Sequence, residues 1–236
     1  QTKDLLNEID VAAGTNFANR IVTNVGNLEN RGIELNINAT PIDRTDFVWE
    51  FGVNGTWNNT EITKLTANNN PDYVGIPTGG VASGTGGTIQ MHSVGHAPNT
   101  FYTYQQVYDV NGKPIQNLVV DRNKDGQITE ADRYLTSYSP APKYYFGFSN
   151  MLTYKDFDFG FNLRANIGNY MFNDFAGGNS TTSNFSNQGF LTNMVDVVNR
   201  TGFTRPSTPQ QIKSDYFIEN ASFLRMDNIT LGYNFD

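Results

Sequence analysis

Side chains that carry oxygen recur at a fixed spacing between Asp121 and Asp132, and this spacing is suited to holding a cation. The segment reads DRNKDGQITEAD and fits the EF-hand pattern D-x-N-x-D-G-x-I-x-x-x-D. In that pattern Asp121, Asn123 and Asp125 offer side-chain oxygens, Gln127 offers a backbone carbonyl and Asp132 closes the shell. Because every ligand is an oxygen atom, the sequence predicts a Ca²⁺ site that stiffens a loop.

Two departures from the EF-hand pattern leave an alternative open. Asp132 is shorter than the bidentate Glu that usually fills its position. The preceding segment, PIQNLVV, reads as extended chain rather than as the entering helix. The alternative is a turn rich in Asp and Asn that holds itself together without an ion.

Aromatic side chains gather in the same polar part of the chain. Tyr73, Tyr102, Tyr104 and Tyr108, together with Phe101, can stack on sugar rings or pack against a peptide, so the four tyrosines are candidate substrate-binding residues. They can equally form a small core that holds a long loop together. No nucleophile, acid–base pair or triad containing His stands out, so we expect no enzyme.

Composition favours an all-β protein. The chain has 236 residues, with 22 Gly, 13% aromatic and only 17% charged residues, and Asn, Thr and Ser are common, which suits strands and turns better than helices. Lys and Arg form no basic stripe and the net charge is −7, which excludes nucleic acid as a partner. The sequence has no run of 18 or more apolar residues, so it predicts no transmembrane helix.

Alternation of apolar and polar residues predicts the strands. After Asp156, the residues Phe157, Phe159 and Phe161 fall on one face and Asp158 and Gly160 on the other, because successive side chains of a strand point to opposite faces. The same period predicts strands over residues 31–42, 47–62, 143–154, 157–167 and 221–235. The last of these changes parity at Leu224 and Met226, which predicts a bulge or a register change there.

The connections between these strands are alternately very short and very long. Turns at residues 43–46 and 155–156 contrast with excursions over 65–142 and 168–220, the second with a short helix expected near residues 190–199. Outer-membrane β-barrels have short periplasmic turns and long extracellular loops, so the pattern predicts an antiparallel transmembrane barrel with an apolar, lipid-facing side and a wet lumen. Aromatic residues near the strand ends fit an interfacial girdle: Trp57, Tyr144, Tyr145 and Tyr154. A soluble sandwich or jelly roll is the competing interpretation, since its inner faces are equally apolar.

Four segments in order along the chain resemble the SusC/RagA type of TonB-dependent transporter. They are NVGNLENRGIELNI from Asn24, DRNKDGQITEADR from Asp121, PKYYFGFSNMLTYKDFDF from Pro142 and SDYFIENASFLRMDNITLGYNF from Ser214. The resemblance implies a 22-stranded barrel in the outer membrane of Bacteroidetes-type bacteria, with a plug inside it. It also implies a SusD-like surface lipoprotein as lid, the TonB complex as energy source, and oligosaccharides or peptides as substrates.

The segments that resemble this family belong to the barrel, and none resembles a plug domain or a TonB-binding box. We therefore expect the chain, over residues 1–236, to be part of the C-terminal half of a longer receptor, with the plug domain absent from it. The alternative from a different class is a secreted, calcium-stabilised β-domain that binds glycans or adhesion partners. The two differ in what covers the apolar faces, lipid in the first and protein in the second.

Overall fold

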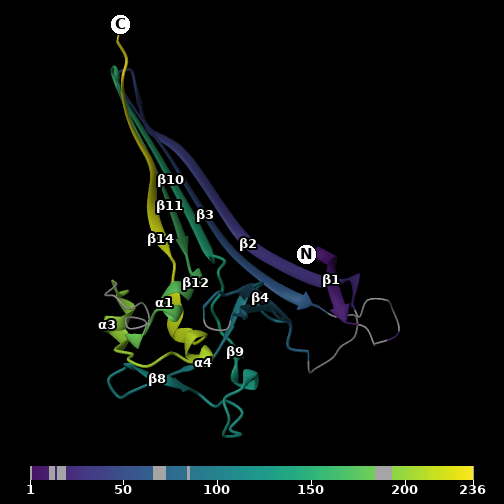
Figure 1. Ribbon diagram of the computed structural model, residues 1–236. Coiled ribbons are helices and arrows are strands. Elements are labelled where there is room, and N and C mark those ends of the chain that lie inside the picture. Colours follow the sequence, from purple (N-terminus) through teal and green to yellow (C-terminus); the bar gives the residue numbers. More distant parts are fainter. Residues whose placement is uncertain are drawn as a thin grey trace.

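A six-stranded antiparallel sheet is the largest element of the computed structural model, which describes residues 2–10, 14, 20–65, 73–83, 86–183 and 193–235 (Figure 1). The order of its strands is β1-β2-β3-β10-β11-β14. Their bounds are β1 Thr2–Asp10, β2 Arg20–Arg44, β3 Phe47–Lys64, β10 Tyr144–Tyr154, β11 Phe157–Ile167 and β14 Phe223–Tyr233. We call this sheet the wall.

The strands differ from the sequence-based ranges mainly in length. Only β11 has the predicted bounds, while β2 is 25 residues long and begins eleven residues earlier than expected. Strand β1, which pairs with this early part of β2, was not predicted, because its segment shows no clean alternation. The bulge expected in β14 is confirmed, since the register with β11 shifts between the pairs Asn162–Asn228 and Leu163–Met226.

One face of the wall is almost continuously apolar because the registers of the five central strands align. Ile37, Val53, Phe148, Leu163 and Met226 form one row across β2, β3, β10, β11 and β14. We call the whole surface the apolar face; it comprises Ile33, Leu35, Ile37, Ala39, Phe47, Trp49, Phe51, Val53, Trp57, Tyr144, Phe146, Phe148, Leu152, Tyr154, Phe157, Phe159, Phe161, Leu163, Ala165, Ile167, Leu224, Met226, Ile229, Leu231 and Tyr233. Several of its members are widely exposed, with Ile33 at 68% and Leu231 at 77%.

The opposite face is polar, and we call it the polar face. Asn38, Gly52, Ser149, Asn162 and Asn228 form its central row across the same five strands. The other members of this face with polar or no side chains are Glu34, Asn36, Glu50, Asn54, Thr56, Gly147, Thr153, Asp158, Gly160, Arg164, Asn166, Arg225 and Thr230. The wall therefore has one apolar and one polar face.

Two residues depart from the expected pattern of faces. Tyr145 was expected in the aromatic girdle, but it pairs with Thr56 and Asn166 and so lies on the polar face. Asn150 lies on the apolar face, where its Oδ1 accepts a hydrogen bond of 2.8 Å from Trp49 Nε1. This contact gives the indole N–H a partner on a surface that lacks other polar groups nearby, although it leaves Asn150 Nδ2 buried without one.

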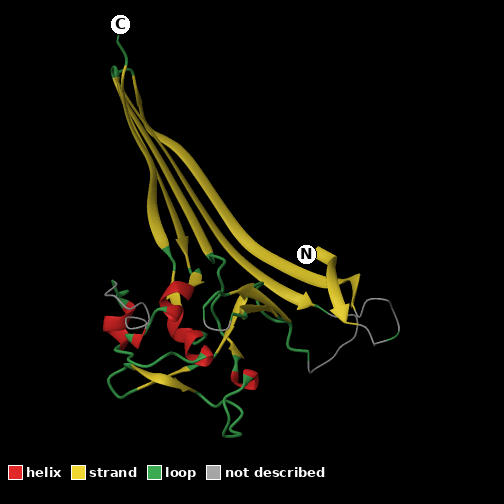
Figure 2. Ribbon diagram, viewed as in Figure 1, coloured by secondary structure: helices red, strands yellow, loops and turns green. Residues whose placement is uncertain are grey.

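All helices and small sheets lie at one end of the wall, and the tight turns β2–β3 and β10–β11 lie at the other (Figure 2). We call the described residues of 73–142 and 168–222 the loop module. Its strands are β4 Ile76–Gly80, β5 Thr88–His92, β6 Thr100–Thr103, β7 Gln106–Tyr108, β8 Pro114–Val119, β9 Tyr134–Leu135, β12 Tyr170–Phe172 and β13 Ile218–Asn220. Its helices are η1 Glu130–Asp132, α1 Asp174–Gly178, α3 Val197–Thr201, α4 Pro209–Ile212 and η2 Asp215–Phe217.

The helix expected near residues 190–199 was placed too early. Residues 190–192 lie outside the described residues, and α3 begins at Val197 and ends before Gly202, whose φ of 67° allows the left-handed cap. Helices α1 and α4 were not predicted, because each is at most five residues long and carries no apolar period. Among the described residues, no helix is long and apolar enough to cross a membrane.

The buried core of the molecule lies at the loop-module end and not in the central wall. Phe101, Phe203 and Phe217 are each 1% exposed, and they come from both long excursions. Hydrogen bonds also join the two excursions. Gln211 Nε2 donates to the side-chain oxygen Oε1 of Gln106 at 2.6 Å, and the backbone N–H of Gln106 donates to Asp215 Oδ1 at 2.9 Å. The two long loops predicted from the sequence therefore fold as one unit.

Candidate functional site

Three hollows follow one another along the polar face, from the loop module towards the tight turns. The first, of about 380 Å³, lies where the loop module meets β3 and β10 and includes Lys143 and Tyr145. Tyr145 also lines the second hollow, of about 320 Å³. Ser149 and Asn162 line both the second hollow and the third, of about 590 Å³. Neighbouring hollows share lining residues and therefore adjoin one another along the wall.

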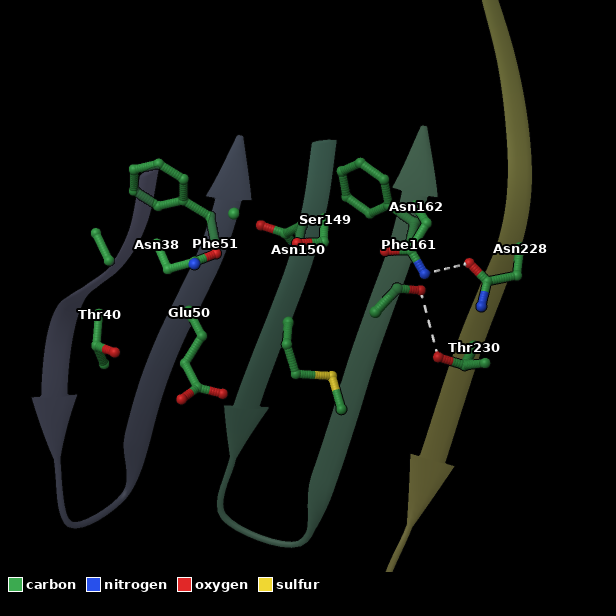
Figure 3. A pocket seen from close by; sticks show the side chains of 14 residues that line it. Asn38, Thr40, Glu50, Phe51, Ser149, Asn150, Phe161, Asn162, Asn228 and Thr230 are labelled. Atoms are coloured by element: carbon green, nitrogen blue, oxygen red, sulfur yellow. Dashed lines mark hydrogen bonds between the residues drawn. The ribbon is translucent and has the colours of Figure 1, made fainter. Parts of the chain in front are cut away.

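The third hollow lies in the middle of the wall, and its polar lining consists of amides, hydroxyls and the carboxylate of Glu50 (Figure 3). Asn162 Nδ2 donates to Asn228 Oδ1 at 2.7 Å, and Ser149 lies on the neighbouring strand. Two glycines leave its floor bare: a Cβ at Gly52 would come within 2.6 Å of Ser149 Oγ, and one at Gly160 within 3.0 Å of a methionine sulfur. Such a surface offers many weak hydrogen bonds to a polar ligand and no reactive group.

The second hollow carries the charge. Asn54, Gly147, Asn162 and Asn166 line it, with Arg164 and Asp227 at its side. Arg164 Nη2 lies 3.3 Å from Asp227 Oδ1. The second hollow thus holds an ion pair, whereas the third holds the carboxylate of Glu50.

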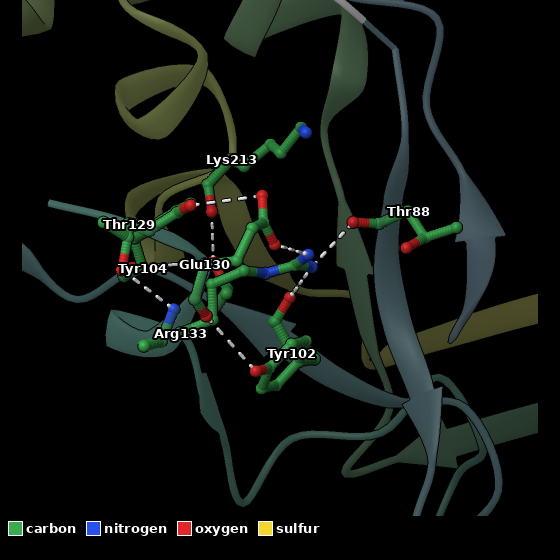
Figure 4. Close-up of polar contacts among 9 residues, drawn as sticks. Thr88, Tyr102, Tyr104, Thr129, Glu130, Arg133 and Lys213 are labelled. Carbon is green, nitrogen blue, oxygen red and sulfur yellow. Dashed lines mark hydrogen bonds and ion pairs between the residues drawn. The ribbon is translucent and has the colours of Figure 1, made fainter. Parts of the chain in front are cut away.

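A buried arginine organises the loop module (Figure 4). The side chain of Arg133 is 5% exposed and pairs with Glu130 at 2.7 Å. Its Nη2 donates to the carbonyl oxygens of Thr88, at 2.7 Å, and Tyr102, at 2.5 Å, and its guanidinium lies 4.3 Å from the centre of the Tyr102 ring. Arg133 therefore joins β5, β6 and η1, and a single arginine in an Asp-rich segment gave no sequence signal for this role.

The four candidate tyrosines do not form one binding surface. Tyr104 is 2% exposed, and burial together with Glu130 raises its pKa to about 12, so it is a packing residue rather than a substrate contact. Tyr102 is half-buried against Arg133. Tyr73 and Tyr108, 37% and 46% exposed, keep accessible surface, and Tyr108 lies beside Tyr216 with ring centres 6.4 Å apart. The alternative of a loop core fits Tyr102 and Tyr104.

The loop from Asp121 to Asp132 folds as a tight turn whose carboxylates accept backbone N–H groups. Asp121 accepts from the amides of Lys124 and Gly126, at 2.6 Å and 2.8 Å. Asp132 is buried and accepts from Arg122 at 2.9 Å and Thr129 at 2.8 Å. Hydrogen bonds from the backbone N–H groups of Thr129, Arg122 and Asn123 hold the pKa of Asp132 below its usual range.

These contacts bear on the calcium prediction. Asn123 accepts from the amide of Asp125, and Asp125 from that of Gln127, so the side chains at positions 1, 3, 5 and 12 all bind the loop's own backbone. Within the described residues, no three or more His, Asp or Glu side chains are placed to hold a metal ion. The structure thus favours the self-supporting turn, and the Ca²⁺ site stays a prediction.

One further carboxylate was not singled out from the sequence. Asp215 accepts from Tyr134 Oη at 2.7 Å and from the amide of Gln106 at 2.9 Å. Burial raises its pKa, because an apolar environment disfavours the charged form. It lies at the contact between the two excursions, which only the folded structure reveals.

Comparison with curated proteins identifies relatives along the whole chain. The TonB-dependent receptor SusC of Bacteroides thetaiotaomicron is 45% identical over 238 residues, which cover 100% of this chain and 23% of SusC. The TonB-dependent receptor P3 of Formosa agariphila is 27% identical over 232 residues, which cover 90% of this chain and 22% of that receptor. No protein-family model matches the chain. The chain spans about a quarter of the length of the relatives it matches.

Comparison with solved structures agrees on the fold. The RagAB peptide transporter matches with a TM-score of 0.65 and 21% identity, over 98% of this chain and 25% of that one. The RagAB peptide importer in its open-open state matches with a TM-score of 0.70 and 22% identity, over the same shares. Together with the alternating wall, these likenesses define a segment of a β-barrel TonB-dependent receptor. Within that class, the chain belongs to the SusC/RagA type.

Proposed function

We propose that this chain forms part of the wall and the extracellular loops of a TonB-dependent importer in the bacterial outer membrane. The observation that carries the proposal is the two-sided wall, whose apolar face extends across five strands with Asn150 as a polar interruption, while the other face is polar. In this arrangement the apolar face contacts lipid and the polar face lines the lumen of the barrel. The loop module then lies outside the cell, and the tight turns lie in the periplasm.

The length of the strands supports a wall that spans the membrane. Strands β10 and β11 have 11 residues each. At about 3.4 Å per residue such a strand is roughly 35 Å long, and a tilt of about 45° reduces its height to about 25 Å, the height of the apolar band of outer-membrane barrels. Aromatic residues lie at both ends of the apolar face, with Tyr144 beside Trp57 at one end and Tyr154 beside Phe47 at the other.

The adjoining hollows support transport of a polar solute along the wall. Their lining of amides, hydroxyls and bare glycine backbone can exchange hydrogen bonds with a moving ligand without holding it tightly. Oligosaccharides and peptides both fit this description, since each presents many neutral donors and acceptors. We propose substrates from these two classes, in line with the relatives SusC and the RagAB peptide transporter.

A SusD-like surface lipoprotein is the proposed partner, and the TonB complex the proposed energy source. Support for both comes from the likeness to SusC and RagAB. The loop module suits a partner that rests on it, because Arg133 and the buried phenylalanines give it a defined surface rather than a set of loose loops. We infer no catalytic activity, in keeping with relatives that are receptors and transporters.

Purification of the full-length receptor from outer membranes tests the proposal. We expect it to require detergent and to bring a lipoprotein with it in equal amount, which mass spectrometry of the purified complex would identify. A receptor that is soluble without detergent and purifies alone would overturn the proposal that the protein is an importer. The secreted, calcium-stabilised β-domain would then be the better interpretation.

A further inference from the structure

Two arginines lie directly opposite each other on the polar face, beside the second hollow. The register of β11 and β14 pairs Arg164 with Arg225 on the same side of the sheet. Like charges at opposed positions destabilise a sheet, so their presence calls for a compensating anion. Side-chain exposures of 51% and 67% show that both remain accessible from this face.

The bulge in β14 supplies part of that compensation. Asp227 is the extra residue between the pairs Asn162–Asn228 and Leu163–Met226. It turns its carboxylate towards both arginines, with Oδ1 3.3 Å from Arg164 Nη2 and 3.5 Å from Arg225 Nε. Both distances exceed the roughly 2.7–2.9 Å of a strong charge-assisted bond, so one oxygen is shared loosely between two cations.

The balance of charge and donors favours a second anion. Two guanidinium groups against one carboxylate leave an excess of one positive charge, and each guanidinium has five N–H donors, of which the contact with Asp227 uses one. The adjoining hollow of about 320 Å³ adds the side-chain amides of Asn54 and Asn166. A planar group that accepts two parallel hydrogen bonds matches this set of donors.

We propose that Arg164 and Arg225 bind a carboxylate that enters the second hollow from the lumen. The carboxylate has two sources: an acidic unit of the transported substrate, or an acidic side chain from another part of the full-length receptor that lies inside the barrel. The first source rests on the proposed import function, and the second does not. In either case the incoming carboxylate joins Asp227 between the two arginines.

The surrounding charges make this location selective along the path. Lys143 and Glu61 line the first hollow and balance each other, Arg164 and Asp227 line the second beside Arg225, and Glu50 lines the third. An acidic group that moves inward therefore meets an excess of positive charge at the arginine pair and a like charge at the third hollow. The arginine pair is the point where such a group is held before it passes Glu50.

Binding of two matched peptides to the purified full-length receptor tests the proposal. Triglutamate and triglutamine have similar size and differ in three carboxylates, and calorimetry at low and high salt measures their affinities. For a site that takes substrate carboxylates, we expect triglutamate to bind about tenfold more tightly at low salt, a preference that high salt weakens. The double variant Arg164→Gln/Arg225→Gln should lose this preference, and Asp227→Asn should enlarge it, because the competing carboxylate is gone.

Arg31→Gln is the matched control, since it removes one charge from β2 of the same sheet, away from the hollow. If the carboxylate comes from the receptor itself, wild type shows no preference for triglutamate. The double variant then lowers the resistance of the barrel interior to protease more than Arg31→Gln does. A double variant that matches Arg31→Gln in both measurements overturns the proposal. If the double variant does not fold, Asp227→Asn provides the test instead. The proposal is overturned if Asp227→Asn changes neither the preference for triglutamate nor the protease resistance.

These outcomes are independent of transport. A receptor that binds triglutamate through the two arginines but imports nothing would contradict the proposed function and leave this site in place. A receptor that imports substrate while all variants bind alike would keep the function and remove the site.

Discussion

Replacement of Phe161 by Arg provides the most direct test of which face meets lipid. Phe161 is the fifth of the 11 residues of β11 and lies near the middle of the apolar face, opposite Asn150 and Ile229. An arginine at the bilayer midplane costs about 2–4 kcal/mol. Loss of the contacts with Phe148 and Phe159, whose ring centres are 5.7 Å and 5.9 Å away, adds about 1 kcal/mol. We therefore expect Phe161→Arg to lower the free energy of unfolding by about 3–5 kcal/mol.

Two matched variants separate the effect of lipid from that of arginine itself. Asn162 is the next residue of β11, at the same depth on the polar face, and its replacement by Arg loses one hydrogen bond to Asn228 and should cost about 1 kcal/mol. Phe157 lies on the apolar face but next to the tight turn, where the cost of an arginine falls to about 0–1 kcal/mol before the loss of its contact with Tyr233. We therefore expect Phe161→Arg to lower the free energy of unfolding more than either control does.

The assay is a denaturant titration of the full-length receptor in phospholipid bilayers, with the folded fraction read from heat-modifiable mobility on gels. If Asn162→Arg destabilised the receptor more than Phe161→Arg, the assignment of the two faces would be reversed. If Phe161→Arg cost no more than about 0.5 kcal/mol, as surface changes usually do, the apolar face would not meet lipid at all.

Three further outcomes concern the loop module. Arg133→Met should leave the carbonyl of Tyr102 unpaired and cost the module about 3 kcal/mol, seen as faster hydrogen exchange in β6 with β10 and β11 unchanged; equal exchange would refute its structural role. Because the pKa of Asp132 lies below its ordinary value of 3.8, its carboxylate stabilises the loop at neutral pH and loses this effect as the pH falls below about 4. The protection factor of the Thr129 amide should decrease over the same range, and a protection factor that does not change with pH would contradict this. For the calcium prediction, added Ca²⁺ should raise the protease resistance of the loop in wild type and not in Asp125→Ala; no effect in wild type would leave the ion-free turn.

The strands of the wall could be predicted from the sequence because each strand shows its two faces in its own alternation of residues. An alternating strand reports its two faces through every second residue, and the short turn at residues 155–156 fixes the β10–β11 register. Even the bulge at Asp227 was detectable, since an extra residue reverses the parity of Leu224 and Met226 relative to Ile229. Tyr145 was expected in the girdle because it lies near the end of its strand, although its parity is opposite to that of Tyr144 and places it on the polar face.

The loop module was not predictable in the same way because its contacts are long-range. The pair Gln106–Gln211 joins residues 105 apart in the chain, and Arg133 bonds Thr88 across 45 residues. Neither has a local pattern, and short helices such as α4 carry too few residues to show a period. The arginine pair beside the second hollow belongs to the same class, since only the register of β11 and β14 makes Arg164 and Arg225 neighbours.

The separation of the buried core from the central wall has a consequence for how such receptors diversify. Phe101, Phe203 and Phe217 support the loop module from within, while the wall demands only that apolar and polar residues alternate. A change of loop sequence that preserves this core and the polar contacts of Arg133 and Gln106 need not alter the alternation of the wall. The loop module can therefore be exchanged as a unit, and its boundary with the wall, at Lys64–Tyr144 and Ile167–Phe223, is the place to join chimaeras.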